Sequence, residues 1–210
     1  MLLATGTLVG YFKQGGFVMW PLLVLSIIAL IVILERGFTL YVRARTKTAE
    51  MVGKVRRLLA EGKTDAALKA CDEYKGPTSA MVKAAVLRWD ANGEELGKLL
   101  ENAALHEIAR LERWIWVLAL VSNIAPILGF LGTVVGMIQS FEVIAREGLN
   151  NPGSVAKGIS VALITTAGGL IVAVFTLPFY NFYTTKIAAY IREMETTANI
   201  VLETHGQLKK

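Results

Sequence analysis

Hydroxyl side chains stand among small residues in two uncharged stretches of the sequence. Thr133 lies in the run Gly129-Phe-Leu-Gly-Thr-Val-Val-Gly136, and Ser160, Thr165 and Thr166 lie in a second run that begins at Gly158. A hydroxyl donates and accepts hydrogen bonds, so it can relay a proton or ligate a cation, but it holds no charge of its own. These residues can therefore line an ion path, whereas a complete proton relay also needs a titratable group.

The same residues also fit close helix packing. Small residues recur every three or four positions in both runs: Gly129, Gly132 and Gly136 in the first, and Gly158, Ala162, Gly169 and Ala173 in the second. Such stripes let two membrane helices approach closely, and a membrane Ser or Thr often bonds a carbonyl of its own helix. From the hydroxyls alone packing is the commoner role, and the ion path stays open beside it.

The uncharged runs hold no titratable group. Residues 14–34, 114–141 and 158–185 contain no Asp, Glu, Lys, Arg or His. If the chain serves a proton channel, a partner must then supply the acid. His106 and His205 have no second His or Cys at ligand spacing, and no catalytic motif is present. We expect a protein that is not an enzyme and that has no metal site and no cofactor.

The elements that position these residues are membrane helices. Each uncharged run reaches the roughly 20 residues that a spanning helix needs, and 54% of the chain is hydrophobic. Of the 22 Lys and Arg, 15 lie between Arg36 and Arg113. This bias predicts a cytoplasmic segment rather than a surface that binds nucleic acid. Cys71, the single cysteine, excludes an internal disulfide. The predicted fold is an all-α membrane protein with three transmembrane helices and long cytoplasmic helical extensions, its N-terminus periplasmic and its C-terminus cytoplasmic.

This topology divides the chain into seven segments. We expect a periplasmic interfacial helix, a first span, a cytoplasmic helical region, a second span, a periplasmic loop, a third span and a cytoplasmic C-terminal helix, at residues 1–16, 17–36, 37–113, 114–141, 142–157, 158–185 and 186–210. The periodicity after Glu94 predicts a helix that runs without a break into the second span.

Several of these stretches resemble the MotA/TolQ/ExbB proton channel family, most closely its TolQ/ExbB branch. The similar stretches are the approach helix from Leu111, Ala125-Pro-Ile-Leu-Gly-Phe-Leu-Gly-Thr-Val-Val-Gly-Met-Ile-Gln-Ser-Phe141, Gly158-Ile-Ser-Val-Ala-Leu-Ile-Thr-Thr-Ala-Gly-Gly-Leu170 and Tyr180-Asn181. The resemblance implies a homopentamer in the bacterial inner membrane. It would enclose single-span partner helices of the ExbD/TolR type, whose intramembrane Asp takes the ion, and it would drive envelope work such as outer-membrane transport.

The resemblance also assigns roles to residues. The threonines that line the ion route in that family match Thr133 and Thr166, and we add Thr165 and Ser160 as further oxygen donors. We expect partner-helix packing at Gly129, Gly132, Gly136, Ala162, Gly169 and Ala173. Val161 stands where the TolQ/ExbB branch has a glutamate, so the transported ion is H⁺ or Na⁺. The alternatives are a structural membrane scaffold and a subunit of the flagellar stator type, which would need a fourth span.

Overall fold

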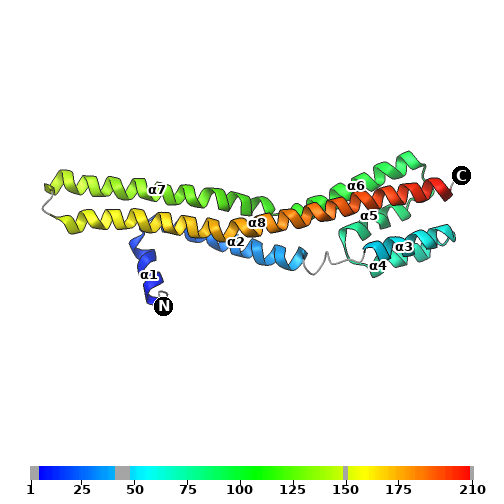
Figure 1. Cartoon of the computed structure of the whole chain (residues 1–210), viewed down its shortest axis with the longest axis horizontal. Coiled ribbons are helices and arrows are strands. Elements are labelled where there is room, and N and C mark those ends of the chain that lie inside the picture. Colours follow the sequence, from blue (N-terminus) through cyan, green and yellow to red (C-terminus); the bar gives the residue numbers. More distant parts are fainter. Residues whose placement is uncertain (1–4, 41–47, 149–150, 209–210) are drawn as a thin grey trace. The chain divides into compact units, whose positions relative to one another are not determined.

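The computed structural model describes residues 5–40, 48–148 and 151–208, and these residues form helices and connecting turns without a strand (Figure 1). The helices are α1 (Thr5–Gln14), α2 (Met19–Phe38), α3 (Thr48–Ala60), α4 (Thr64–Glu73), α5 (Pro77–Val86), α6 (Gly93–Glu112), α7 (Ile115–Glu147) and α8 (Pro152–Leu208). Within the described residues, three helical stretches are long and apolar enough to span a membrane, and they include α2, α7 and the first part of α8. The predicted all-α fold with three membrane helices is confirmed, while the sides on which the termini lie stay predictions.

The chain forms two compact units. One, which we call the membrane unit, contains Met1–Leu34 and Trp114–Asn181, and the other, which we call the polar unit, contains Glu35–Arg113 and Phe182–Lys210. Each unit therefore combines segments that are far apart in the sequence. The seven predicted segments, which also assign sides of the membrane, stay a prediction.

In the membrane unit, α7 and the first part of α8 lie side by side and antiparallel (Figure 1). The residue types explain where α8 begins after the turn. Pro152 is its first residue, and the backbone N–H of Ser154 donates a hydrogen bond to the side chain of Asn151. The start of α2 packs against this pair through a small apolar cluster. Its members are Val18, Leu22 and Ala125, with Met19, Leu128 and Val172 around them.

The helix that leads into the second span is not continuous, contrary to the prediction. α6 ends at Glu112 and α7 begins at Ile115. Between them Arg113 is no longer helical, with a ψ of 130°, and Trp114 has a left-handed backbone with a φ of 66°. A left-handed conformation is costly for a bulky residue, and no Gly or Pro marks the position. The apolar periodicity continues across the break, which is why the sequence suggested one helix.

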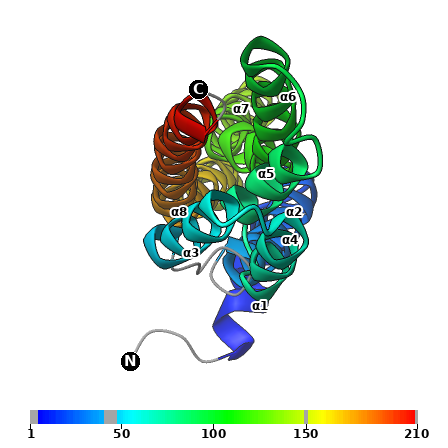
Figure 2. The same cartoon turned by 90° about the vertical axis from the view of Figure 1, so that its right-hand side faces the viewer.

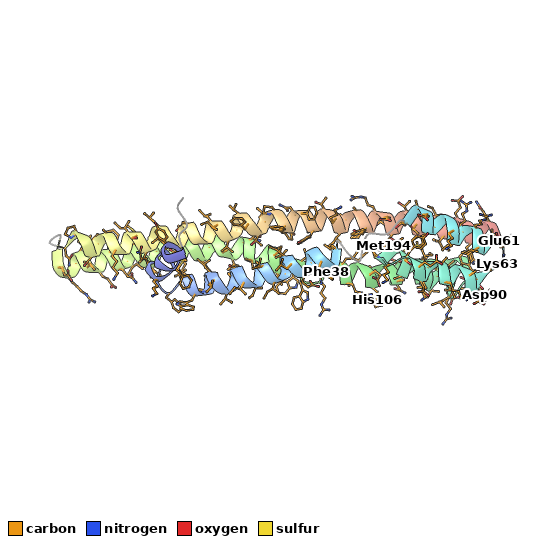
Figure 3. The ribbon with its side chains drawn as sticks, turned by 90° about the horizontal axis from the view of Figure 1, so that it is seen from below. Phe38, Glu61, Lys63, Asp90, His106 and Met194 are labelled. Carbon is orange, nitrogen blue, oxygen red and sulfur yellow. The ribbon has the colours of Figure 1, made fainter. Side chains whose placement is uncertain are left out.

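The polar unit has a water-excluding core like that of a soluble helical protein. In the end-on view of Figure 2, α3, α4 and α5 are grouped with α6 and the last part of α8. Met51, Met81, Leu96 and Leu100 are at most 1% exposed, and Met194, labelled on α8 in Figure 3, is buried as well. Burial of such side chains stabilises a fold by roughly 1.5 to 3 kcal/mol each.

A buried arginine closes the end of α6. The Arg36 guanidinium donates to the carbonyls of Arg110 at 3.1 Å and Leu111 at 3.3 Å, and it pairs with the Glu35 carboxylate. The last carbonyls of a helix have no partner within it, so these bonds satisfy two of them. Arg36 thus has a structural role beside its contribution to the positive charge of the segment.

Candidate functional site

The contact between α7 and α8 brings backbone against backbone. A Cβ atom placed on Gly136 would lie 2.6 Å from the carbonyl oxygen of Gly158 and 2.8 Å from the nitrogen of Ala162. A Cβ on Gly129 would lie 3.0 Å from the carbonyl oxygen of Thr165. Real Cβ atoms essentially never approach backbone atoms as closely as at Gly136, so only glycine fits there, while a Cβ on Gly129 would make contacts tighter than most.

The small residues that we predicted to pack against a partner helix lie largely in this contact. Gly129, Gly132, Gly136, Ala162 and Gly169 are buried between α7 and α8 of one chain, and Ala173 is half-buried. In the single chain the two stripes therefore pack against each other. Helices in lipid gain little from apolar burial and associate through close packing, which the two stripes provide for each other. Contact of these residues with a partner helix stays a prediction.

Thr165 belongs to the same contact. Its side chain is 0% exposed, and its hydroxyl lies 2.9 Å from the carbonyl oxygens of both Val161 and Ala162. The hydroxyl is thus satisfied by its own helix, as membrane threonines often are. In the isolated chain, Thr165 fits packing better than an ion path.

Thr133 and Thr166 occupy a more open position. Both are half-buried. The Thr133 hydroxyl donates to the carbonyl of Phe130 at 2.6 Å, and the Thr166 hydroxyl lies 3.1 Å from the Ala162 carbonyl and 3.2 Å from the Gly129 carbonyl across the helix pair. Because Gly132 meets Thr165 and Gly129 meets Thr166, the two threonines lie at similar depth along the pair.

Both threonines face away from α2. The α2 side of the pair is marked by Leu128 on α7 and by Gly168 on α8, which lies against Met19 and Leu22. At 100° per residue, Thr133 points about 140° away from Leu128, and Thr166 about 160° away from Gly168. We call the surface of α7 and α8 that carries Thr133 and Thr166 the open face.

Ser160 does not join them. It is half-buried and lies six residues before Thr166 on α8, so its side chain points about 120° away from that of Thr166. Of the four predicted oxygen donors, the structure brings Thr133 and Thr166 to one surface, places Thr165 beneath them and leaves Ser160 on another side of α8.

Two polar residues of the membrane unit were not among the predicted site residues. The Ser140 hydroxyl lies 3.1 Å from the Gly136 carbonyl and 3.0 Å from the Val155 carbonyl, so it ties α7 to the start of α8. Its position four residues after Gly136 was a usable signal. Asn123 is exposed on α7, and no pattern in the sequence tells which side of that helix stays uncovered.

Titratable groups do not gather into a metal site within the described residues. No three of His, Cys, Asp and Glu there lie close enough to hold an ion. His205 packs edge-on against the Trp89 ring, and its Nε2 lies 3.1 Å from the Trp89 carbonyl oxygen. Burial raises the pKa of the Cys71 thiol to about 11, so this cysteine is a poor nucleophile at neutral pH. These groups fit structural roles.

The fold and the open face define a class: a helical, multi-pass membrane protein whose uncharged runs carry half-buried hydroxyls that can contact an ion. Residues 73–196 match the MotA/TolQ/ExbB proton channel family, which is more than half of the chain. The chain belongs to this family, as the motifs predicted. The family consists of channel and transport components rather than a class of enzymes.

Several relatives carry ExbB names. A protein of Methanothermobacter thermautotrophicus named as an ExbB homolog is 30% identical over 191 residues, which cover 90% of this chain and 67% of the relative. A Synechocystis protein named ExbB-like 1 is 34% identical over 84% of this chain and 70% of its own length. The biopolymer transport protein ExbB of Pseudomonas putida is 31% identical over 92% of this chain and 61% of its own length. These similarities agree with the TolQ/ExbB branch.

Proposed function

We propose that the chain is the ring-forming subunit of an ion-driven motor in the bacterial inner membrane. Five copies would enclose a pair of ExbD/TolR-like single-span helices, whose intramembrane Asp binds and releases H⁺ or Na⁺. The N-terminus would lie in the periplasm and the C-terminus in the cytoplasm. The coupled work would be biopolymer transport at the envelope, the activity in the name of the Pseudomonas putida relative. Family membership supports the class of this proposal.

One observation carries the ion path: Thr133 and Thr166 lie on the open face, within the uncharged runs 114–141 and 158–185. Each hydroxyl has one proton, and each lies within hydrogen-bond distance of a helix carbonyl. Donation to that carbonyl leaves the lone pairs of the oxygen free. These can accept the proton of a carboxylic acid or ligate a cation, and rotation of the hydroxyl turns the same group into a donor for a carboxylate.

A carboxylate in a membrane needs such neighbours. Transfer of a charge into hydrocarbon is costly unless polar groups replace the lost water. The open face provides two hydroxyls for the partner's Asp and presents no basic group that would hold the Asp permanently ionised. A site of neutral oxygens therefore lets the acid alternate between its charged form and its protonated or cation-bound form.

The residues at this position fit transport of either H⁺ or Na⁺. Val161, where the branch has a glutamate, is half-buried, and its Cγ1 lies 3.7 Å from the position of a Cβ on Gly16. No titratable side chain occupies that position. Hydroxyl oxygens and one carboxylate suit Na⁺, a hard cation, as well as they suit a proton relay.

The test is ion flux in liposomes that contain the chain co-purified with its single-span partner. We expect the double change Thr133→Val and Thr166→Val to lower flux at least tenfold while the complex stays assembled, because Val keeps nearly the size of Thr and lacks the hydroxyl. Thr176→Val is the matched control, since Thr176 is 2% exposed and its hydroxyl bonds the Val172 carbonyl. Flux under a pH gradient and under a Na⁺ gradient identifies the ion. Normal flux in an assembled double variant would show that the threonines only pack, as a structural scaffold requires.

A further inference from the structure

Asn123 is a polar side chain in an apolar part of α7. It is exposed, and it lies nine residues after Trp114 in the uncharged run that ends at Phe141. At 1.5 Å per residue it is therefore about 14 Å from the start of that run, inside a hydrocarbon core of about 30 Å. Its exposed neighbours one turn away, Leu120 and Ile127, are apolar.

Asn123 lies at a different depth from the two threonines. Thr133 follows it by ten residues, which is about 15 Å along the helix. Ala125, two residues after Asn123, meets Gly169 on α8, whereas Gly129 meets Thr166. The two threonines thus lie in one half of the span, and Asn123 lies in the other half, nearer to the N-terminal end of α7.

The amide faces away from α2, as the threonines do. On the helical wheel it points about 140° away from Leu128, which marks the α2 side, and about 80° away from Thr133. Asn123 therefore lies beside the open face. In the part of the chain that the structure describes, no hydrogen bond of its amide is found.

A backbone carbonyl on the same turn lacks its helical donor. Pro126 lies inside α7, and proline has no N–H to give to the residue four positions earlier, which is Ser122. Pro126 is three residues from Asn123, so both lie on one side of the helix. Pro178 has the same effect on the carbonyl of Val174 in α8, at about the depth of Asn123.

Polar groups left without partners in hydrocarbon are costly, and helices accept them where they face protein or a water-filled path. We infer that the Asn123 amide and the Ser122 carbonyl form a neutral oxygen site for the transported monovalent cation, H⁺ in hydrated form or Na⁺, in the half of the span nearer to the N-terminal end of α7. The inference rests on the proposed function and extends the route beyond the threonines. The amide oxygen ligates the cation on its way to or from the partner's carboxylate, which lies at the depth of the threonines.

The test replaces the amide by an apolar group of similar size. In the complex with the single-span partner, Asn123→Leu should lower the flux of H⁺ or Na⁺ into liposomes at least tenfold, and Asn123→Gln should restore at least half of it. Gln139→Leu is the matched control, because it removes an exposed amide of the same helix that points about 160° away from Asn123. Its flux should equal that of the wild type.

A second variant separates an ion site from a contact between helices. Asn123→Asp keeps the size and adds a titratable group, so at a site on the route it should shift the pH profile of the flux by at least one unit. An unchanged profile overturns the inference, as does normal flux in assembled Asn123→Leu. Dissociation of the Asn123→Leu complex with an unchanged profile for Asn123→Asp would mean that the amide only joins two helices, which also overturns it. A wild-type complex without any flux would instead contradict the proposed function itself.

Discussion

The membrane unit and the polar unit of this protein arrange their side chains in opposite ways. In the membrane unit large apolar side chains lie outside, and Phe130, Val174 and Phe175 are 67 to 68% exposed. The glycines of the contact between α7 and α8 lie inside, as do the side chains of Ser140, Thr165 and Thr176. In the polar unit Met51, Met81 and Leu96 lie inside, and ion pairs such as Lys54–Glu73 and Lys83–Asp72 lie at the surface.

The difference follows from the solvent of each unit. In water, burial of apolar surface drives helices together, so the largest side chains are placed between them. In lipid that drive is absent, and helices associate where small residues let backbones touch. A glycine therefore has opposite meanings in the two units: between membrane helices it permits contact, and on an exposed helix surface in water it only weakens the helix.

The largest effect should come from one methyl group in the membrane unit. Gly136→Ala places a Cβ 2.6 Å from the Gly158 carbonyl oxygen and 2.8 Å from the Ala162 nitrogen, and neither backbone atom can move without separating α7 from α8. We expect a loss of about 3 kcal/mol, at the upper end for overpacking. Thermal denaturation in detergent, followed by size-exclusion chromatography, measures it.

Gly168→Ala is the control within the same unit. Its Cβ would lie 3.5 Å from the Met19 side chain, which is an ordinary contact. This variant should therefore denature at the same temperature as the wild type. If Gly136→Ala were equally tolerated, the close contact of α7 and α8 would not hold the membrane unit together.

The sequence predicted what each helix contains better than what it contacts. The uncharged runs predicted three spans, and the periodicity placed Gly129, Gly132 and Gly136 on one face. It could not tell whether that face meets another subunit or α8 of the same chain, because periodicity defines a surface and not its neighbour. The same limit hid Asn123, whose exposure depends on where α2 and α8 pack.

The break at Trp114 was missed for a different reason. Helix ends are usually recognised from Gly, Pro or a capping residue, and Asn92 is such a case, since its side chain accepts a bond of 2.8 Å from the N–H of Glu95 at the start of α6. At Trp114 a bulky residue takes the left-handed conformation, and no local preference indicates it. For the site, residue types predicted the hydroxyls, while only the packed helices show that Thr133 and Thr166 are half-buried and Thr165 is buried.

A smaller effect should appear in the pH dependence of stability, because the Cys71 thiol is buried in the core of the polar unit. Cys71 is 1% exposed, and burial raises its thiol pKa from 9.0 to about 11. The folded state then holds the proton more tightly than the unfolded state, so the contribution to stability is complete below pH 9 and is lost as the pH rises from 9 to about 11. Between pH 8 and pH 10.5 the free energy of unfolding should fall by about 2 kcal/mol.

The variant Cys71→Ala should lack this part of the pH dependence. The measurement is chemical denaturation of both proteins at pH 8 and pH 10.5, and the quantity of interest is the difference between their pH slopes. Equal slopes would mean that water reaches the thiol and that the core is looser than the buried methionines indicate. The wild-type thiol should also resist alkylation at pH 7.5 until the protein is denatured.

The smallest effect should come from a Gly→Ala change in the polar unit, which should stabilise the protein, whereas Gly136→Ala destabilises it. Gly53 lies inside α3, is exposed, and has nothing within 4 Å of the position that a Cβ would take. Gly53→Ala therefore meets no obstacle and reduces the conformational freedom of the unfolded chain, so it should stabilise the polar unit by about 0.5 to 1 kcal/mol. Thermal denaturation of Gly53→Ala beside Gly136→Ala measures both signs under one set of conditions. Destabilisation by Gly53→Ala would show that a neighbouring chain covers this surface of α3, and the contrast between the two units would then not extend to the assembled protein.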